Sequence, residues 1–340
     1  MKKIAAALLC AWLALPALAS RQLTDDAGHS VTLPDRVDRI AEGWFAHHSL
    51  LMTLGAGDNI VATVNRPDSR PWMFHLDPRL NQALISRGPH FTSEALLARG
   101  AEVVFVAQGN GDAEAYRQAG LPVMEMSFTD YPSLARSVTT TAEVLGTPQA
   151  LARAQAYNRY LQQTIARIGQ RTAALTDAER PRVLHIQSLK PLKVDGSHTL
   201  IDTWIRLAGG QNAAAGIEGN MQEISPEKVL VWQPDIIILG AGCGDLAHSA
   251  YRDLFSTLQA VKNQQVRQNP AGVFPWDRYG TESALQIQWA AKQIQPQRFA
   301  DIDMLAVTRD FYQRFFDYPL SESEASRILQ ALPPQRKDGK

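Results

Sequence analysis

The sequence has few of the groups that stabilise small exported proteins covalently. Only two cysteines occur in 340 residues, and the first, Cys10, lies in an N-terminal segment that we expect to be removed. The remaining Cys243 cannot form an intramolecular disulfide on its own. The fold must therefore be stabilised by buried apolar cores, and about 320 mature residues are more than one core usually carries, which predicts two domains.

An excess of one charge is also absent. Lys and Arg together number 34, as do Asp and Glu. No basic tract follows the first residues, which argues against nucleic acid as a partner and against a polybasic membrane patch. Beyond the N-terminal segment, no apolar run reaches the ~20 residues that a helix needs to cross a bilayer. These absences predict a soluble chain, which we take to be a monomer.

Local catalytic and metal-binding motifs are missing as well. The sequence contains no G-x-S-x-G elbow, no Walker A loop and no G-x-G-x-x-G fingerprint, and no histidine stands in a zinc spacing such as H-E-x-x-H. A bare metal site usually takes three or four protein ligands. Each histidine is therefore more simply a packing or capping residue, although His47 or His48 can complete the coordination of a metal that arrives already chelated.

Cys243 provides the one enzymatic alternative. It lies in A-G-C-G-D at 241–245, and a nucleophilic thiol needs a nearby base that lowers its pKa, for which His248 is the local candidate. An exported α/β enzyme that uses Cys243 and His248 is therefore a second hypothesis. A small residue in a glycine-rich turn is the simpler interpretation.

Residues 1–19 have the pattern of a cleavable signal peptide. Lys2 and Lys3 form a basic start, Ile4 to Leu15 is apolar, and Ala17-Leu18-Ala19 supplies small residues for cleavage. The apolar stretch is too short to span a bilayer. This pattern predicts export to the periplasm.

A short unit occurs twice. Residues 92–106 read T-S-E-A-L-L-A-R-G-A-E-V-V-F-V and residues 225–239 read S-P-E-K-V-L-V-W-Q-P-D-I-I-I-L. Glu94 aligns with Glu227, and Glu102 aligns with Asp235. Each copy predicts a short helix opened by a hydroxyl-bearing residue and followed by a buried strand. A carboxylate in the first turn is favourable for a helix in any case, but two matched surface acids can also be recognised by a partner with two arginines.

Strands and helices alternate on both sides of a long helical stretch. The pattern predicts an α/β fold with two Rossmann-like lobes joined by a single long helix, with a ligand cleft between the lobes. We expect an N-terminal lobe over 23–132, a bridging helix over 133–176, a C-terminal lobe over 181–317 and a polar tail over 318–340.

Ligands of open α/β sheets lie beyond the carboxyl ends of the strands. The segments that follow the predicted strands are rich in aromatic residues, arginines and glycines, which suits a large and partly anionic ligand. The candidate ligand-binding residues are Trp44, His47, Arg66, Trp72, Trp276, Arg278 and Tyr279.

The segment F-P-W-D-R-Y-G-T-E-S at 274–283 is the densest of these. Trp276 and Tyr279 can stack on a ligand, and Arg278 can pair with an anionic oxygen. Alternatively, Asp277 pairs with Arg278 and the segment is structural. Glu282 is expected to lie at the start of the following helix.

With these features in place, the chain resembles ABC-transporter periplasmic substrate-binding proteins of the iron-siderophore, haem and vitamin B12 class, the helical-backbone type. The resemblance covers nearly all of 23–317. It is carried by D-D-A-G-H-S-V-T-L-P at 25–34, R-I-A at 39–41, L-A-G-G-Q-N at 207–212, I-S-P-E-K-V-L-V-W-Q-P-D-I-I-I-L at 224–239, L-Q-A-V-K-N at 258–263 and W-D-R-Y-G-T-E-S at 276–283.

The resemblance implies a non-enzymatic receptor that needs no cofactor. It would bind an iron-siderophore or similar metal chelate, or alternatively cobalamin, haem or a nickel chelate. It would deliver this ligand to an inner-membrane ABC permease, on whose arginines Glu94 and Glu227 would dock. Some siderophore receptors use clustered arginines, for which Arg66, Arg70 and Arg278 are candidates here. Relatives that bind bare zinc or manganese have well-spaced histidines and acids, and this chain departs from that pattern.

Overall fold

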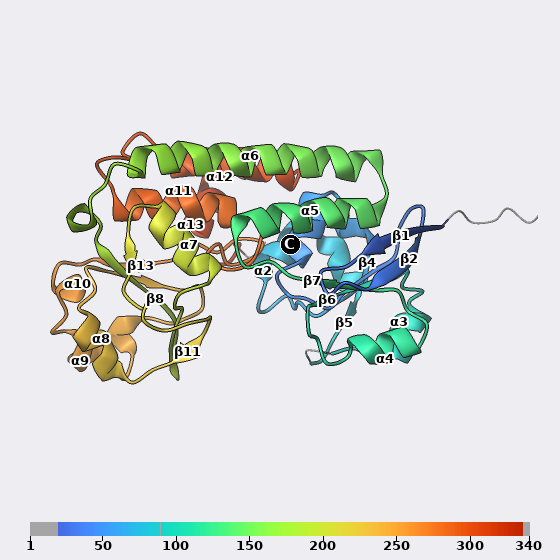
Figure 1. The fold of residues 1–340 in the computed structure, drawn as a ribbon, viewed down its shortest axis with the longest axis horizontal. Coiled ribbons are helices and arrows are strands. Elements are labelled where there is room, and N and C mark those ends of the chain that lie inside the picture. The colour runs from blue at the N-terminus through green and yellow to red at the C-terminus, as the bar shows by residue number, and fades with distance from the viewer. Residues whose placement is uncertain (1–19, 89, 336–340) are drawn as a thin grey trace, which may run out of the picture.

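The computed structural model describes residues 20–88 and 90–335 and consists of two α/β lobes joined by a layer of helices (Figure 1). The predicted signal peptide lies outside the described residues. Within the part of the chain that is described, no helix has both the length and the apolar character needed to cross a membrane.

The N-terminal lobe is built on a parallel sheet with strand order β5–β4–β3–β6–β7. Helices cover both faces of such a sheet, so its central strands are apolar throughout, as in β6, where four of five residues are buried. A separate hairpin of β1 and β2 precedes it. The elements are β1 (Ser20–Thr24), β2 (Ser30–Pro34), β3 (Ile40–Glu42), α1 (His48–Thr53), β4 (Ile60–Thr63), α2 (Pro71–Leu76), β5 (Leu84–Ile85), α3 (Ser93–Ala98), β6 (Val103–Ala107), α4 (Ala113–Gln118) and β7 (Val123–Met126).

The C-terminal lobe has the strand order β11–β9–β8–β12–β13, with β10 also paired to β8. Strands β8, β12 and β13 are parallel, whereas β9 returns beside β8 as an antiparallel hairpin. The elements are β8 (Arg182–Leu189), β9 (Leu192–Val194), α7 (Leu200–Leu207), β10 (Gln211–Asn212), β11 (Gln222–Glu223), α8 (Pro226–Trp232), β12 (Ile236–Leu239), α9 (Arg252–Phe255), α10 (Gln259–Lys262) and β13 (Val266–Gln268).

The repeated unit has the same structural role in both lobes. Glu102 precedes β6, and its carboxylate accepts hydrogen bonds from the backbone N–H groups of Asp38 and Arg39, just before β3. Asp235 precedes β12, and its carboxylate accepts one from the N–H of Arg182, at the start of β8. The pair β3–β6 therefore corresponds to the pair β8–β12, and the carboxyl ends of these strands are equivalent.

The segment expected to be one bridging helix is divided into α5 (Tyr131–Leu145) and α6 (Pro148–Thr172). Gly146 ends α5 in a left-handed conformation with a φ of 71°, which glycine adopts readily, and Pro148 begins α6. Only α6, which is 25 residues long, runs from one lobe to the other (Figure 1). Arg153 Nε donates to the Thr53 carbonyl in the N-terminal lobe, and Thr172 Oγ1 donates to the Leu207 carbonyl in the C-terminal lobe.

Two C-terminal helices, α11 (Ser283–Ile294) and α12 (Met304–Phe315), pack against α6, and α13 (Glu322–Leu329) packs against α12. The interval 318–340, expected to be a polar tail, thus contains a helix, which a capping box of Ser321 and Glu324 starts and which buries Ala325 and Ile328. One continuous cluster of buried apolar side chains extends from the N-terminal lobe through these helices into the C-terminal lobe. The shared core implies a stiff connection between the lobes.

Candidate functional site

A cavity of about 300 Å³ lies between the lobes, at the carboxyl ends of their strands. The N-terminal lobe contributes the loop after β4 and the start of α2, and the C-terminal lobe contributes the turn after β12 and the loop before α11. The lining residues are Asp68, Ser69, Arg70, Pro71, Trp72, Ala241, Gly242, Ala271, Gly272, Pro275, Ala331, Leu332 and Pro333. The cavity matches the strand-end position expected for a ligand site.

Arg70 provides the positive charge of this cavity. Its guanidinium lies 4.7 Å from the centre of the Phe274 ring, and its Nη1 donates to the backbone carbonyl of Ser69 at 2.7 Å. Among the described residues no carboxylate forms an ion pair with it, and its buried Nε has no hydrogen-bond partner. Burial lowers the pKa of Arg70, although the negative charge of Asp277 acts in the opposite direction. A guanidinium still has donors for an anionic ligand in this position.

Behind the cavity, His185 connects two buried carboxylates. Its Nδ1 lies 2.8 Å from Asp195 Oδ2, and its Nε2 lies 2.7 Å from Asp277 Oδ2. Arg278 Nη1 donates to both oxygens of Asp195 at 3.0 Å. Burial alone would lower the pKa of His185, but the hydrogen bonds and charges of the two carboxylates outweigh it and raise this pKa to about 9. With His185 protonated, this group of four residues has no net charge.

Buried acceptors converge beside this group. Gln187 Oε1 and Asp277 Oδ1 have no hydrogen-bond partner among the described residues. A Cβ on Gly240, at the end of β12, would lie 3.0 Å from Gln187 Oε1 and 3.1 Å from Asp277 Oδ2. Buried polar atoms are normally hydrogen-bonded, so unpaired ones at a strand end are typical of a site that a ligand or water completes.

An aromatic row also crosses between the lobes, from Trp44 through Phe128 to Tyr279. The ring centres of Trp44 and Phe128 lie 5.0 Å apart, and those of Phe128 and Tyr279 lie 5.9 Å apart. Trp44 and Tyr279 are partly exposed, and the neighbouring Phe45 is 40% exposed. This row offers stacking surface to a ligand larger than the cavity.

The other residues predicted to bind ligand are engaged elsewhere. Trp276 is buried and its Nε1 donates to Glu282 at 3.0 Å. Trp72 is almost fully buried and donates to the Leu332 carbonyl. Arg66 is exposed, and its guanidinium donates to the carbonyls of Ser86 and Arg87. These contacts give each side chain a structural role, although Trp72 still forms part of the cavity wall.

The adjacent histidines are both buried in the N-terminal lobe. His47 uses both ring nitrogens, with Glu42 at 2.7 Å and Thr141 at 2.9 Å. His48 Nδ1 lies 3.1 Å from Thr63 Oγ1, and burial together with the charge of His47 lowers the pKa of His48 to about 3. His48 is therefore neutral at physiological pH. Both ring nitrogens of His47 are engaged, and His48 Nε2 is buried, so neither histidine offers a lone pair to the cavity.

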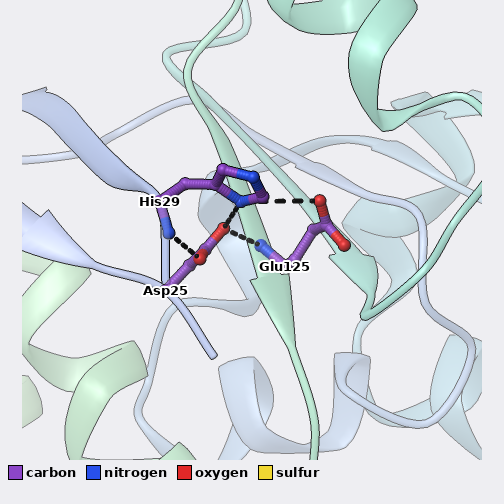
Figure 2. Close-up of side chains that lie close together, drawn as sticks. All are labelled: Asp25, His29 and Glu125. Carbon is purple, nitrogen blue, oxygen red and sulfur yellow. Dashed lines mark hydrogen bonds and ion pairs between the residues drawn. The ribbon is translucent and has the colours of Figure 1, made fainter. Parts of the chain in front are cut away.

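A third histidine belongs to a cluster that has the composition of a metal site. Asp25, His29 and Glu125 lie together where the β1–β2 hairpin meets β7 (Figure 2). The position of a cation is already taken, because Arg117 Nη2 lies 2.7 Å from Glu125 Oε1, 3.2 Å from His29 Nδ1 and 3.6 Å from Asp25 Oδ2. Asp25 also accepts a hydrogen bond from the N–H of Glu125. The cluster anchors the hairpin to the sheet edge.

Glu94 and Glu227 are exposed in the first turns of α3 and α8, the equivalent helices of the two lobes. Thr92 caps α3 by accepting from the N–H of Ala95, as expected. Ser225 makes no side-chain cap hydrogen bond, so the expectation of two equivalent caps holds for one lobe only.

Cys243 lacks the surroundings of a nucleophile. Burial, with a smaller contribution from the charge of Asp277, raises the pKa of its thiol to about 12. His248 is exposed and pairs with Asp245 at 2.7 Å. A thiol that stays protonated at neutral pH does not support the Cys243–His248 hypothesis.

Comparison with known proteins defines the class to which this architecture belongs. The family model described as periplasmic binding protein matches residues 48–271, and the chain belongs to that family. It is a solute-binding protein of the kind that serves ABC importers and not an enzyme, so the hypothesis of a Cys243–His248 enzyme is wrong. Membership is consistent with the periplasmic location predicted from residues 1–19.

Individual relatives extend over almost the whole chain. The molybdate-binding protein MolA of Haemophilus influenzae is 26% identical, over 96% of this chain and 99% of its own. The structure of MolA with bound molybdate has a TM-score of 0.78 at 22% identity, over 88% of this chain and 99% of that one. Helicobacter pylori CeuE with bound Ni(II) has a TM-score of 0.74 at 18% identity, over 91% and 99%. The two structures show a common fold.

Proposed function

We propose that this protein captures a small metal-containing anion in the cavity between its lobes and delivers it to an inner-membrane ABC importer. The observation that carries the proposal is Arg70, a partly buried guanidinium that lines the cavity and has no carboxylate partner among the described residues. The buried group of His185, Asp195, Asp277 and Arg278 is neutral overall, and Arg70 is the one basic side chain of the lining. The one acidic side chain of the lining, Asp68, is exposed and forms no ion pair with Arg70 among the described residues, so the guanidinium stays available to a ligand. Such a site favours an anion.

The size of the cavity favours a small ligand. Its volume of about 300 Å³ lies at the lower end of the ~300–1,000 Å³ typical of small-molecule sites. A tetrahedral oxyanion fits with room for water, while the unpaired oxygens of Gln187 and Asp277 are buried and lie outside the lining of the cavity. The name of the 26% identical relative, a molybdate-binding protein, agrees with this chemistry.

An anionic metal chelate such as a ferric siderophore is the second candidate. The aromatic row of Trp44, Phe128 and Tyr279 favours it, because partly exposed rings at a cleft stack on flat organic ligands. This candidate requires that the ligand extend beyond the cavity toward the row. Cobalamin, haem and nickel chelates share this requirement.

A calorimetric panel separates the candidates. Molybdate, tungstate, sulfate, a ferric tris-hydroxamate, Ni(II)-histidine, haem and cobalamin would each be titrated into the mature protein. We expect molybdate or tungstate to bind tightest, and Arg70→Met to weaken that binding by ~10–100-fold through loss of a charge-assisted contact. Arg66→Met is the matched control, since Arg66 is exposed and lies outside the cavity lining. Tight binding of a ferric chelate with no oxyanion binding would establish the second candidate instead.

Delivery requires contact with the permease. We assign this role to Glu94 and Glu227, because both are exposed, both begin equivalent helices and each lobe carries one. Matched carboxylates of this kind complement two basic side chains related by a twofold axis. The receptor would act as a monomer in the periplasm.

A further inference from the structure

The chain end forms one wall of the cavity between the lobes. Ala331, Leu332 and Pro333 follow α13 and line the cavity together with residues 68–72 and the turn after β12. These three residues lie about 50 positions beyond the last motif singled out in the sequence, which ends at Ser283, and nothing in the local pattern marks them as part of a site.

Hydrogen bonds hold the wall to α13 and to the N-terminal lobe. The Leu332 carbonyl accepts from the indole Nε1 of Trp72 at 2.9 Å, while the Leu332 N–H donates to the Arg327 carbonyl at 2.8 Å. Arg327 Nε in turn donates to the Pro333 carbonyl at 2.6 Å. These bonds fix the backbone of the segment in the position where it borders the cavity.

The helix that carries the wall is fastened to both lobes. The Ile328 carbonyl accepts from the N–H of Ala271, in the loop before α11. On the other side, His75 of α2 lies 3.1 Å from the Tyr318 hydroxyl and 3.3 Å from Glu324 Oε1. Ala331, the first residue of the wall, has a φ of 55°, a left-handed conformation that is unfavourable for residues other than glycine and persists where surrounding contacts impose it.

The wall contributes shape and no free donor for an anion, since the N–H groups of Ala331 and Leu332 donate to the carbonyls of Ile328 and Arg327. The Leu332 carbonyl is already occupied by Trp72, proline has no N–H, and the side chains of Leu332 and Pro333 are apolar. Leu332 remains 40% exposed, so it is not part of the buried core. A ligand larger than the cavity on this side would have to displace the segment and break the bonds that hold it.

We infer that residues 331–333 form a specificity-determining wall that limits the size of the ligand. The inference rests on the proposed function, because it concerns the same cavity. A wall in this position limits how far a ligand can extend past Trp72.

Truncation tests the wall. A protein that ends at Gln330 lacks it, and a protein that ends at Gln335 is the matched control. We expect the shorter protein to bind molybdate about tenfold more weakly and a ferric tris-hydroxamate about tenfold more tightly than the control. Leu332→Ala, which keeps the backbone and the Trp72 hydrogen bond, should shift both affinities in the same directions to a smaller extent, and it covers the case in which the truncated protein does not fold.

A second measurement does not depend on ligand. The contribution of Trp72 to acrylamide quenching, obtained as the difference between proteins with Trp72 and with Trp72→Phe, should rise at least about threefold after truncation at Gln330, because the indole loses its cover. Unchanged quenching, or an unchanged order of ligand affinities in both the truncated and Leu332→Ala proteins, would overturn the inference. If neither oxyanion nor chelate binds the full chain, the proposed function fails, and the quenching result still decides whether the segment covers the cavity.

Discussion

Each lobe contains a buried histidine paired with acid. At the equivalent strand position, one lobe has the acid and the other has the histidine. Arg39 and Arg182 correspond through the repeated unit, so Glu42 in β3 corresponds to His185 in β8. In the N-terminal lobe the strand supplies the acid, and the following loop supplies His47. In the C-terminal lobe the strand supplies the base, and two acids, Asp195 and Asp277, come from elsewhere.

The difference shows how each lobe treats buried charge. Glu42 is fully buried, and burial raises its pKa against the influence of His47, so this pair can become neutral by taking up one proton. The C-terminal lobe has two acids for one histidine and uses Arg278 to balance them. Arg278 therefore pairs with Asp195 inside the protein. No carboxylate among the described residues pairs with Arg70 of the N-terminal lobe, so its charge stays available to a ligand.

The largest expected effect is on folding stability. His185→Leu leaves two buried carboxylates with one arginine and should lower the free energy of unfolding by about 3–5 kcal/mol. His47→Leu should cost only about 1–3 kcal/mol, since Glu42 can protonate. Urea unfolding at pH 6 measures both, with the exposed His248→Leu as control. Equal losses of unfolding free energy in His185→Leu and His47→Leu would contradict this difference between the lobes.

The same contrast predicts a dependence on pH. The pKa of His185 is about 9 in the folded protein, against ~6.5 in an unfolded chain, so its contribution is complete below about pH 6.5 and is lost as pH rises through 9. The loss should be on the order of 3 kcal/mol. Burial also raises the pKa of Glu282, to about 7, and this group acts in the same direction. The decline between pH 6.5 and 9 should therefore persist in Glu282→Gln and shrink in His185→Leu, as followed by urea unfolding.

The two arginines should separate affinity from stability. Arg70→Met is expected to reduce affinity for the anion by ~10–100-fold while unfolding changes little, because no buried carboxylate loses its ion pair. Arg278→Met should lower stability by about 2–4 kcal/mol, because Asp195 loses a buried partner, and should change the affinity of the folded protein less than about threefold. Calorimetry and thermal unfolding of each variant give the two values. If Arg278→Met lowered affinity and Arg70→Met lowered stability, Arg278 would be the ligand-binding arginine, as first expected from the sequence.

The two surface glutamates should behave alike. Reversing either charge, in Glu94→Lys or Glu227→Lys, is expected to reduce transport about tenfold, and the double variant should abolish it, since each lobe loses one contact with the permease. Ligand affinity should not change, because both residues are exposed helix-start acids outside the cavity lining. Uptake into proteoliposomes and calorimetry measure these effects. A loss of affinity would show that the residues do not act in docking.

The smallest effect concerns the helices that carry these glutamates. Thr92→Ala removes a side-chain cap and should cost about 1 kcal/mol, whereas Ser225→Ala removes no hydrogen bond and should cost less than ~0.3 kcal/mol. Thermal unfolding of the two variants would detect the difference. Equal costs would contradict the difference between the two caps.

Several elements could be predicted to the residue. Val103–Ala107 and Val123–Met126 are strands, as the sequence predicts. The first is a continuous apolar run between turn residues, which is typical of a buried parallel strand, and the second is apolar except for Glu125. The helix-breaking run Gly146-Thr147-Pro148 interrupts the predicted helical stretch, and α5 ends and α6 begins there. The helices α12 and α13 were missed, because their short amphipathic patterns were attributed to the lobe and to a tail.

The site was less predictable than the fold. No sequence signal shows which of Arg66, Arg70 and Arg278 binds a ligand. Only their contacts in the folded chain distinguish them. Arg278 meets Asp195, which lies 83 residues away, while Arg66 bonds to backbone carbonyls about 20 residues away. Arg70 was considered but not chosen, although the loop rich in proline and aromatic residues around it was a signal.

The sequence by itself determined the α/β architecture, the duplicated unit, the family and the two surface glutamates, because periodicity, caps and helix-start acids depend on neighbours along the chain. Only the tertiary structure decided which arginine keeps a free charge, why Trp72 and Trp276 are buried, and that residues 331–333 border the cavity. The physical reason is that the free energy of a charged or polar side chain depends on the partners that surround it. Those partners, such as Leu332 for Trp72 and Asp195 for Arg278, come from distant parts of the chain.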